Sequence, residues 1–260
     1  MAQYPFVVQS LIAGILASLA CGLGSLPLLI KRFDVAKRVG IGYGFAGGLM
    51  FSASVYNLLL PALNLGQSTI SVYQVILTLV GIFSGAVFLW GVEIHMTPER
   101  LARSILRGIG TRREALIFIA MSFHSIPEGV AVGVGYTSTE QIATTTDLGH
   151  YIALAIAIHN IPEGLAVAIP MRAAGASIPK CFLFAFLTSL PQPLAAVPAS
   201  LLVWFFKPLM VPFLGFAAGA MMFLVIVELI PDALADRTAN EIAWAFLVGF
   251  GGMVLIQVVL

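Results

Sequence analysis

The sequence predicts an all-α integral membrane protein with eight transmembrane helices. Of its 260 residues, 60% are hydrophobic and only 10% are charged, and the mean hydropathy is +1.01. A single water-soluble core cannot bury so much apolar surface, so the bilayer must solvate it. Apolar runs of about 20 residues, the length that crosses the hydrocarbon layer, recur along the chain. We therefore expect one transmembrane transporter domain, residues 1–260.

Eight apolar segments, separated by short polar loops, account for nearly the whole chain. The first lacks a basic region ahead of its apolar run, so we expect a retained span and no cleaved signal peptide. The fourth and fifth contain proline and ionisable residues, which lowers their hydropathy without excluding them from the membrane. The expected spans are 6–30, 39–63, 72–94, 115–136, 149–171, 181–206, 211–230 and 241–260.

The distribution of Lys and Arg predicts how these spans are oriented. With the N-terminus outside, all of the 13 Lys and Arg except Lys207 fall in inner loops. Positive charge concentrates in the cytoplasmic loops of membrane proteins. We therefore expect both termini outside, because a miscounted span would have mixed the charges between the two sides.

Two pairs of segments in the sequence resemble each other. Residues 44–60 (GFAGGLMFSASVYNLLL) resemble 215–231 (GFAAGAMMFLVIVELIP), and 124–134 (HSIPEGVAVGV) resemble 159–169 (HNIPEGLAVAI). Because the paired spans run in opposite directions, the pattern predicts a 3+2+3 inverted repeat, a plan that recurs in secondary transporters. The alternative is coincidence among the small residues that pack membrane helices, and it carries more weight for the first pair.

Two acidic residues, Glu128 and Glu163, are expected in the middle of the membrane. An ionised carboxylate there costs a few kcal/mol unless a cation or water compensates it. Each follows a histidine, His124 or His159, by four residues, which places both side chains on one face of a helix, one turn apart. Each helix therefore presents a pair of metal ligands.

Together these four residues form a candidate metal site with two imidazoles and two carboxylates. This set suits Zn²⁺ and also Fe²⁺, Mn²⁺, Co²⁺ or Ni²⁺. Two carboxylates neutralise one dication, which makes the site tolerable in a low-dielectric interior. The alternative is a network of mutually hydrogen-bonded His and Glu without metal, which the duplication of the motif makes less favoured.

Other classes of function fit the sequence less well. The net charge of +1 and the dispersal of basic residues over short loops argue against a nucleic-acid partner. An intramembrane zinc-dependent hydrolase is an alternative, but the chain has no HExxH signature and no recognisable nucleophile motif. A metal-selective channel with the same ligands at lower affinity also stays open. No prosthetic group is expected.

The paired HxIPEG segments on adjacent spans, the basic third loop and the eight spans resemble the ZIP family of metal transporters. Three segments place the resemblance in its bacterial GufA or ZupT-like branch: GFAGGLM, PQPLAAVPA and GFAAGAMMFLVIVELIP. The resemblance implies a multi-pass protein of the plasma membrane (the bacterial inner membrane) that moves Zn²⁺, and also Fe²⁺, Mn²⁺ or Cd²⁺, into the cytoplasm by alternating access. His124, Glu128 and Glu163 match the family's primary ligands, whereas the position of His159 contributes variably.

The chain departs from the family pattern at a second metal position that some members carry. That position would use Ser125, Asn160 and Gln192, all neutral here, so a second dication would lack charge compensation. We therefore expect one tight site. Its partners would be the metal ion and the lipid bilayer, and a homodimer is left open.

Three further residues have weaker claims to a role. Met50 is a candidate thioether ligand, and His95 and Glu228, both expected near the inner surface, are candidates for the ion path. For each, the alternative is ordinary packing or a solvated charge.

Overall fold

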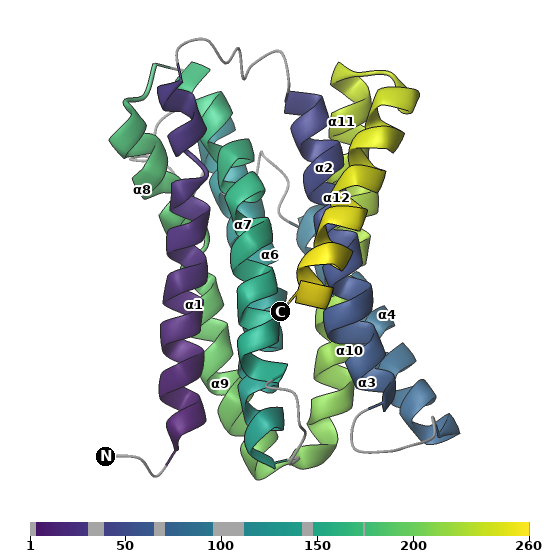
Figure 1. Ribbon diagram of the computed structural model, residues 1–260. Helices are drawn as coiled ribbons and strands as arrows, with labels where there is room; N and C mark the ends of the chain where they lie inside the picture. Colours follow the sequence, from purple (N-terminus) through teal and green to yellow (C-terminus); the bar gives the residue numbers. More distant parts are fainter. Residues whose placement is uncertain are drawn as a thin grey trace.

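The computed structural model describes residues 4–30, 39–64, 71–95, 112–141, 148–173 and 175–259, and within these ranges all regular secondary structure is helical (Figure 1). The first span is α1 (Pro5–Leu23), followed by the short 3₁₀ helix η1 (Leu26–Leu29). The second is a continuous rod of α2 (Val39–Ala53), the π-helical segment η3 (Ser54–Leu59) and α3 (Leu60–Asn64). The third is α4 (Val72–His95).

The remaining five spans follow in order. The fourth and fifth are α6 (Arg112–Gln141) and α7 (Leu148–Ala173). The sixth consists of α8 (Ile178–Thr188) and α9 (Pro191–Phe205). After the 3₁₀ helix η4 (Lys207–Leu209), the seventh comprises α10 (Met210–Leu224), the π-helical segment η5 (Val225–Leu229) and α11 (Ile230–Asp236). The eighth is α12 (Ala239–Val259).

The predicted all-α membrane fold with eight spans is confirmed, with two differences in detail. Among the described residues, seven helical segments are long and apolar enough to cross a membrane, and α6 is the one that falls short. Its helix nevertheless runs for 30 residues, longer than the expected 115–136. The sixth span is interrupted at Ser189–Leu190, because Pro191 has no N–H to continue the α-helical ladder.

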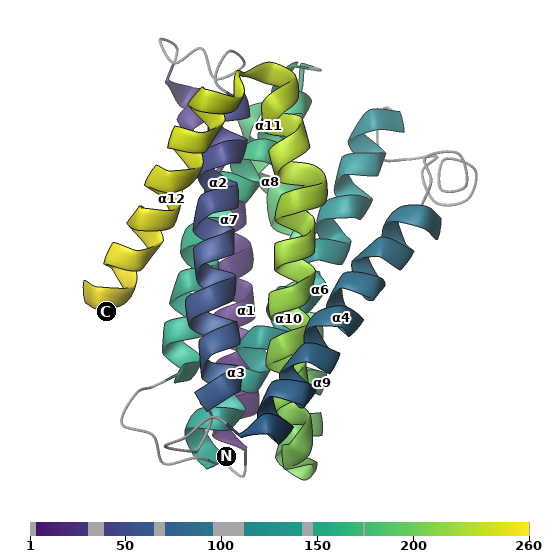
Figure 2. The same cartoon turned by 90° about the vertical axis from the view of Figure 1, so that its right-hand side faces the viewer.

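Packing between the helices follows the internal repeat. Helix α2 of the first half packs against α12 of the second half, and α10 of the second half packs against α4 of the first (Figure 2). Gly48 and Gly219 are equivalent positions (44 pairs with 215, and so 48 with 219). At each, an added Cβ would overlap a backbone carbonyl oxygen of the partner helix, that of Phe246 or Ile82. The two halves therefore bury glycines against partner helices in the same way.

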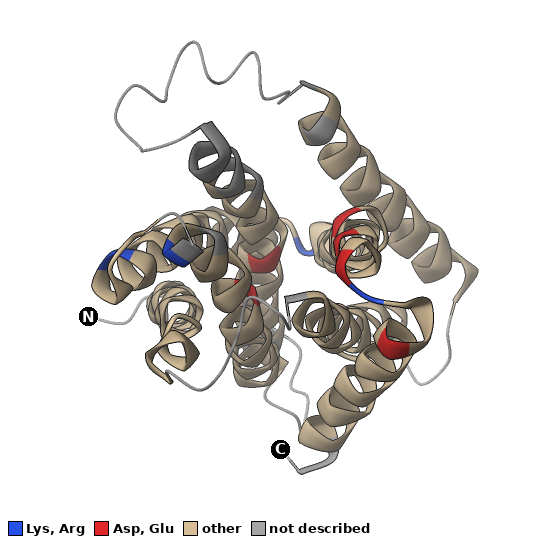
Figure 3. Cartoon of the chain, turned by 90° about the horizontal axis from the view of Figure 1, so that it is seen from above, with Lys and Arg blue, Asp and Glu red and all other residues tan. Residues whose placement is uncertain are grey.

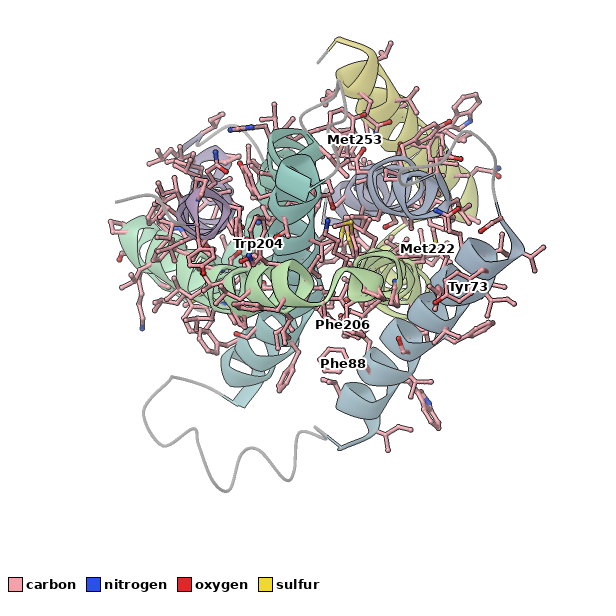
Figure 4. All side chains as sticks on the ribbon, turned by 90° about the horizontal axis from the view of Figure 1, so that it is seen from below. Tyr73, Phe88, Trp204, Phe206, Met222 and Met253 are labelled. Atoms are coloured by element: carbon pink, nitrogen blue, oxygen red, sulfur yellow. The ribbon has the colours of Figure 1, made fainter. Side chains whose placement is uncertain are left out.

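Apolar side chains fill the spaces between helices and also cover the outer surface. Phe6 of α1 stacks on Trp204 of α9 with ring centroids 4.7 Å apart, and Met253 is fully buried between α12 and its neighbours (Figure 4). By contrast, Tyr73 on α4 and Trp244 on α12 are exposed. These outward-facing side chains are suited to a lipid environment rather than to water.

Described basic residues separate between the two ends of the bundle. Arg172, Lys180 and Arg237 lie at the ends of α7, α8 and α11, which all reach the upper end in Figure 1. Lys207 lies in the connection between α9 and α10 at the lower end. This separation agrees with the grouping expected from the sequence. Which end faces the cytoplasm stays a prediction.

Candidate metal centre

Three of the four predicted ligands converge inside the bundle. Glu128 of α6 and His159 and Glu163 of α7 each offer a ligand atom, and these atoms all lie within 4.8 Å of one another. His159 Nε2 is 3.2 Å from Glu128 Oε1. Seen from above, acidic residues lie on ribbons in the middle of the bundle (Figure 3). The three residues are at most 6% exposed, so the carboxylates are held away from bulk solvent.

Polar atoms of this group lack partners. Glu163 Oε2 and His159 Nδ1 are buried and have no hydrogen-bond partner among the described residues. An unpaired buried polar atom costs about 1–3 kcal/mol, and more when the group is charged. A dication between the carboxylates would accept electron pairs from Glu163 and Glu128 and offset their mutual repulsion. The donor set therefore fits a transition metal better than it fits an apolar core.

Close helix packing fixes the two carboxylates in place. The residue after each is a glycine, and both are sites where an added Cβ would overlap a backbone carbonyl oxygen: that of Gln192 for Gly129, and that of Cys21 for Gly164. Glycine lets α6 approach α9, and α7 approach α1, at backbone distance. The glutamates are thus carried on helices that have little freedom to shift sideways.

His124, the fourth predicted ligand, lies apart from this cluster. Its Nε2 is 3.5 Å from Glu228 Oε1 on η5, and its Nδ1 has no partner in the described part of the chain. The two histidines of the repeat therefore face different carboxylates. The sequence did not predict this pairing, because equal spacing along α6 and α7 says nothing of which neighbouring helix each histidine meets.

A cavity of about 690 Å³, open mouth included, connects His124 with the central cluster. Glu163 lines it and also belongs to the cluster. Met50 and Glu228, both predicted as secondary residues, line it too, together with Asp232. Residues of α2, α6, α7, α10, η5 and α11 line the cavity, and α11, which carries Asp232, lies at the upper end of the bundle (Figure 1).

A hydrogen-bond network of Gln192, Asn160 and Ser189 fixes the Glu128 carboxylate. Gln192 donates from Nε2 to Glu128 Oε2, while its Oε1 accepts from Asn160 Nδ2 (3.1 Å) and from Ser189 Oγ (3.0 Å). Asn160 also donates to the carbonyl of Ala17 (3.0 Å). Gln192 thus orients one carboxylate and Asn160 holds Gln192 in place, while the buried Oδ1 of Asn160 has no hydrogen-bond partner among the described residues.

Ser125 belongs to the same support. Its hydroxyl lies 3.2 Å from the carbonyls of Met121 and Thr188, the second of which is freed by the break in the sixth span. The break therefore supplies an acceptor that a continuous helix would have used itself.

His95 is the last residue of α4, and its side chain lies outside the described part. Asp232 was missed, although it follows Glu228 by four residues, the spacing that singled out the two HxxxE pairs. That signal was available in the sequence.

Comparison with known proteins points to one family. The sequence model described as ZIP zinc transporter matches residues 104–257. The chain is 32% identical to zinc transporter GufA of Myxococcus xanthus over 244 residues, which cover 92% of this chain and 94% of GufA. It is 30% identical to zinc transporter ZupT of Chlorobium phaeovibrioides, with 88% of each chain covered.

Longer relatives match over part of their length. The chain is 41% identical to zinc transporter ZIP11 of Homo sapiens over 152 residues, which cover 58% of this chain and 44% of ZIP11. The match to an Arabidopsis thaliana relative covers 36% of that protein. The chain thus spans less than half the length of these two relatives. All the relatives compared here are named as transporters and none as an enzyme, which counts against the hydrolase alternative.

Proposed function

The chain belongs to the ZIP family of zinc transporters, and from this premise we propose that it carries Zn²⁺ or a related divalent ion through the membrane by way of Glu128, His159 and Glu163. His124 completes the set as the ion passes between this cluster and the cavity. The ion is substrate, and no resident cofactor is needed. The proposed direction is toward the end of the bundle that carries Arg172, Lys180 and Arg237, which the distribution of basic residues assigns to the cytoplasm.

One observation carries this proposal above the others: two buried carboxylates share a site with an imidazole, and Glu163 Oε2 has no partner in the described structure. Packing alone gives no reason to keep two acids together in a low-dielectric interior. A dication between them would make the ligand set electrically neutral. Glu128, His159 and Glu163 can release the bound ion only if another ligand competes for that ion.

His124 and Glu228 are the groups that could compete. They lie 3.5 Å apart on the wall of the cavity, and Glu163 reaches both the cavity and the cluster. An ion could therefore exchange one ligand at a time without losing charge compensation. The cavity supports release at the upper end of the bundle.

Alternating access explains a cavity that ends at buried ligands better than an open channel does. The inverted repeat supplies two halves that can exchange roles, so a cavity at one end can close while its counterpart opens. A channel would need a continuous path past the buried ligands, all of which are at most 6% exposed. We propose a single tight site, because Gln192 and Asn160 are neutral and would leave a second dication without charge compensation.

The test is transport by purified protein in liposomes loaded with a zinc-sensitive dye. Wild type should fill the vesicles with Zn²⁺, and Glu163→Ala and His124→Ala should each lose at least about 90% of the rate, because each removes a ligand that cannot be replaced. His150→Ala, which removes an exposed histidine at the start of α7, is the matched control and should transport normally. Wild-type vesicles that fill no faster than empty ones, while the protein binds Zn²⁺, would refute the carrier.

A further inference from the structure

The internal repeat gives each residue that lines the cavity a counterpart in the other half. Positions in α2 and η3 map onto α10 and η5 as 44 maps onto 215, and positions in α6 map onto α7 as 124 maps onto 159. The cavity residues His124, Glu228 and Met50 therefore correspond to His159, Asn57 and Met221. If the halves exchange roles, these counterparts would line a cavity at the opposite end of the bundle, hereafter the far end.

In this structure the counterparts form a closed plug. The cavity has twelve described lining residues, and eleven of their counterparts are at most 3% exposed, Pro61 being the exception. The plug is mostly apolar and belongs to the main hydrophobic core. Among its members are Leu58, Val132, Ile156, Leu214 and Met221.

Asn57 is the polar residue of the plug outside the metal ligands. It occupies the position of Glu228, and both lie in π-helical segments that begin at equivalent residues, Ser54 and Val225 (44 to 215 is the same shift as 54 to 225). A π-helical turn is rare and is frequently found at functional sites. Its occurrence at the same place in both halves indicates a shared role for Asn57 and Glu228.

The surroundings of Asn57 differ from those of Glu228. Asn57 is 2% exposed, and its Oδ1 accepts a hydrogen bond of 2.7 Å from Gln257 Nε2 on α12. Its Nδ2 is buried and has no partner in the described part of the chain. In addition, η3 packs against α7, the helix that carries His159. The Asn57 amide therefore lies in a segment packed against α7, with its oxygen hydrogen-bonded to Gln257 of α12 and its nitrogen without a partner among the described residues.

We propose that Asn57 is a metal-binding residue of the state that opens at the far end. In that state the hydrogen bond from Gln257 to the Asn57 amide oxygen is broken. The oxygen then lies beside His159, as the Glu228 carboxylate lies beside His124 in this structure. A neutral amide oxygen binds a dication more weakly than a carboxylate does. The ion would therefore bind with lower affinity at Asn57 than at Glu228. This inference rests on the proposed transport function.

Transport kinetics test the ligand role. In vesicles of one orientation, with Zn²⁺ supplied at the far end, Asn57→Asp should lower the KM at least about fivefold and Asn57→Leu should raise it at least about fivefold, because only the carboxylate strengthens the contact. The affinity of the purified proteins for Zn²⁺ should stay within about twofold of wild type, since Glu128, His159 and Glu163 are untouched. Gln74→Leu, which removes a buried amide from α4, should change neither value.

Cysteine labelling tests whether the hydrogen bond from Gln257 to Asn57 holds the far end closed, and it does not need Asn57 to be replaced. Ala217 lies in the plug and Ala46, its counterpart, lines the cavity. A membrane-impermeant maleimide added at the far end should label Ala217→Cys slowly, and at least about threefold faster when Gln257→Leu is added, since loss of one buried hydrogen bond favours the open state. Labelling of Ala46→Cys from the other side should slow.

The outcomes separate the two proposals. If wild type carries no Zn²⁺, the transport function itself is wrong. If wild type transports, but both Asn57 variants keep the wild-type KM or Gln257→Leu leaves the labelling of Ala217→Cys unchanged, the role of Asn57 and Gln257 is refuted while the transporter stands.

Discussion

Gln192 shows how a single neutral residue can decide the chemistry of the site. Its amide nitrogen donates to Glu128, and its oxygen accepts from Asn160 and Ser189, so every part of the amide has a partner. An acid at this position could not donate to Glu128 and would add a third negative charge. The amide therefore fixes one carboxylate in orientation and leaves the site balanced for one dication.

Gln192→Leu tests this orienting role. The change removes the donor to Glu128 and one of the acceptors of the Asn160 amide, which keeps its bond to the carbonyl of Ala17. We expect the affinity for Zn²⁺ to fall about 10–100-fold, the usual effect of losing a group that orients a metal ligand, with the protein still folded. Titration calorimetry of the purified protein checks it. Unchanged affinity would mean that Gln192 only fills space.

Glu163→Gln tests whether the paired carboxylates cost stability without metal. Replacement of one acid by a neutral isostere removes the repulsion between Glu128 and Glu163, so the metal-free variant should melt at or above the wild-type temperature. Zn²⁺ at about 100 times its dissociation constant should stabilise wild type by about 2.7 kcal/mol and the variant by far less. Thermal unfolding in detergent measures both.

The opposite pattern would contradict this explanation. A metal-free Glu163→Gln protein that unfolds well below wild type, or one that keeps the full stabilisation by Zn²⁺, would show that Glu163 serves the packing of α7 and not the ion.

At the scale of elements, the sequence predicted the helices well and their interruptions less well. Length and hydropathy are enough to recognise seven of the spans, and α6 was located because the apolar segments on either side left no other partition of the chain. The break before Pro191 was not predicted, since proline is also tolerated inside membrane helices, as Pro127 and Pro198 are here. The π-helical segments η3 and η5 had no signal in composition. They depend on how neighbouring helices pack.

Gly164→Ala tests whether the approach of α7 to α1 positions the site. The added methyl would overlap the backbone carbonyl oxygen of Cys21, so the two helices must separate. We expect a loss of about 1–3 kcal/mol in the free energy of unfolding, together with weaker Zn²⁺ binding, because Glu163 moves with the helix. Gly251→Ala on α12 is the matched control, since no atom lies within 4 Å of the added carbon.

A combination of results would overturn this interpretation. If Gly164→Ala binds Zn²⁺ and unfolds like Gly251→Ala, α1 and α7 are not held at the distance that the site requires.

For the whole molecule, the sequence predicted the inverted repeat but could not predict which state the structure adopts. The repeat in sequence treats both halves alike, whereas in the structure one set of equivalent residues lines a cavity and the other set is packed into a plug. The difference depends on small energies between two packings of the same helices. For the same reason the sequence could join four ligands into one site, while the structure places His124 beside Glu228 and the other three together.

The position of a bound ion is the most direct test of the whole account. Crystals of the purified protein grown with Zn²⁺ and measured at the zinc absorption edge should give one strong anomalous peak among the Glu128, His159 and Glu163 side chains, with ligand distances of about 2.0–2.2 Å. A fully occupied crystal with no peak between these residues, or with its strong peak elsewhere in the bundle, would contradict it.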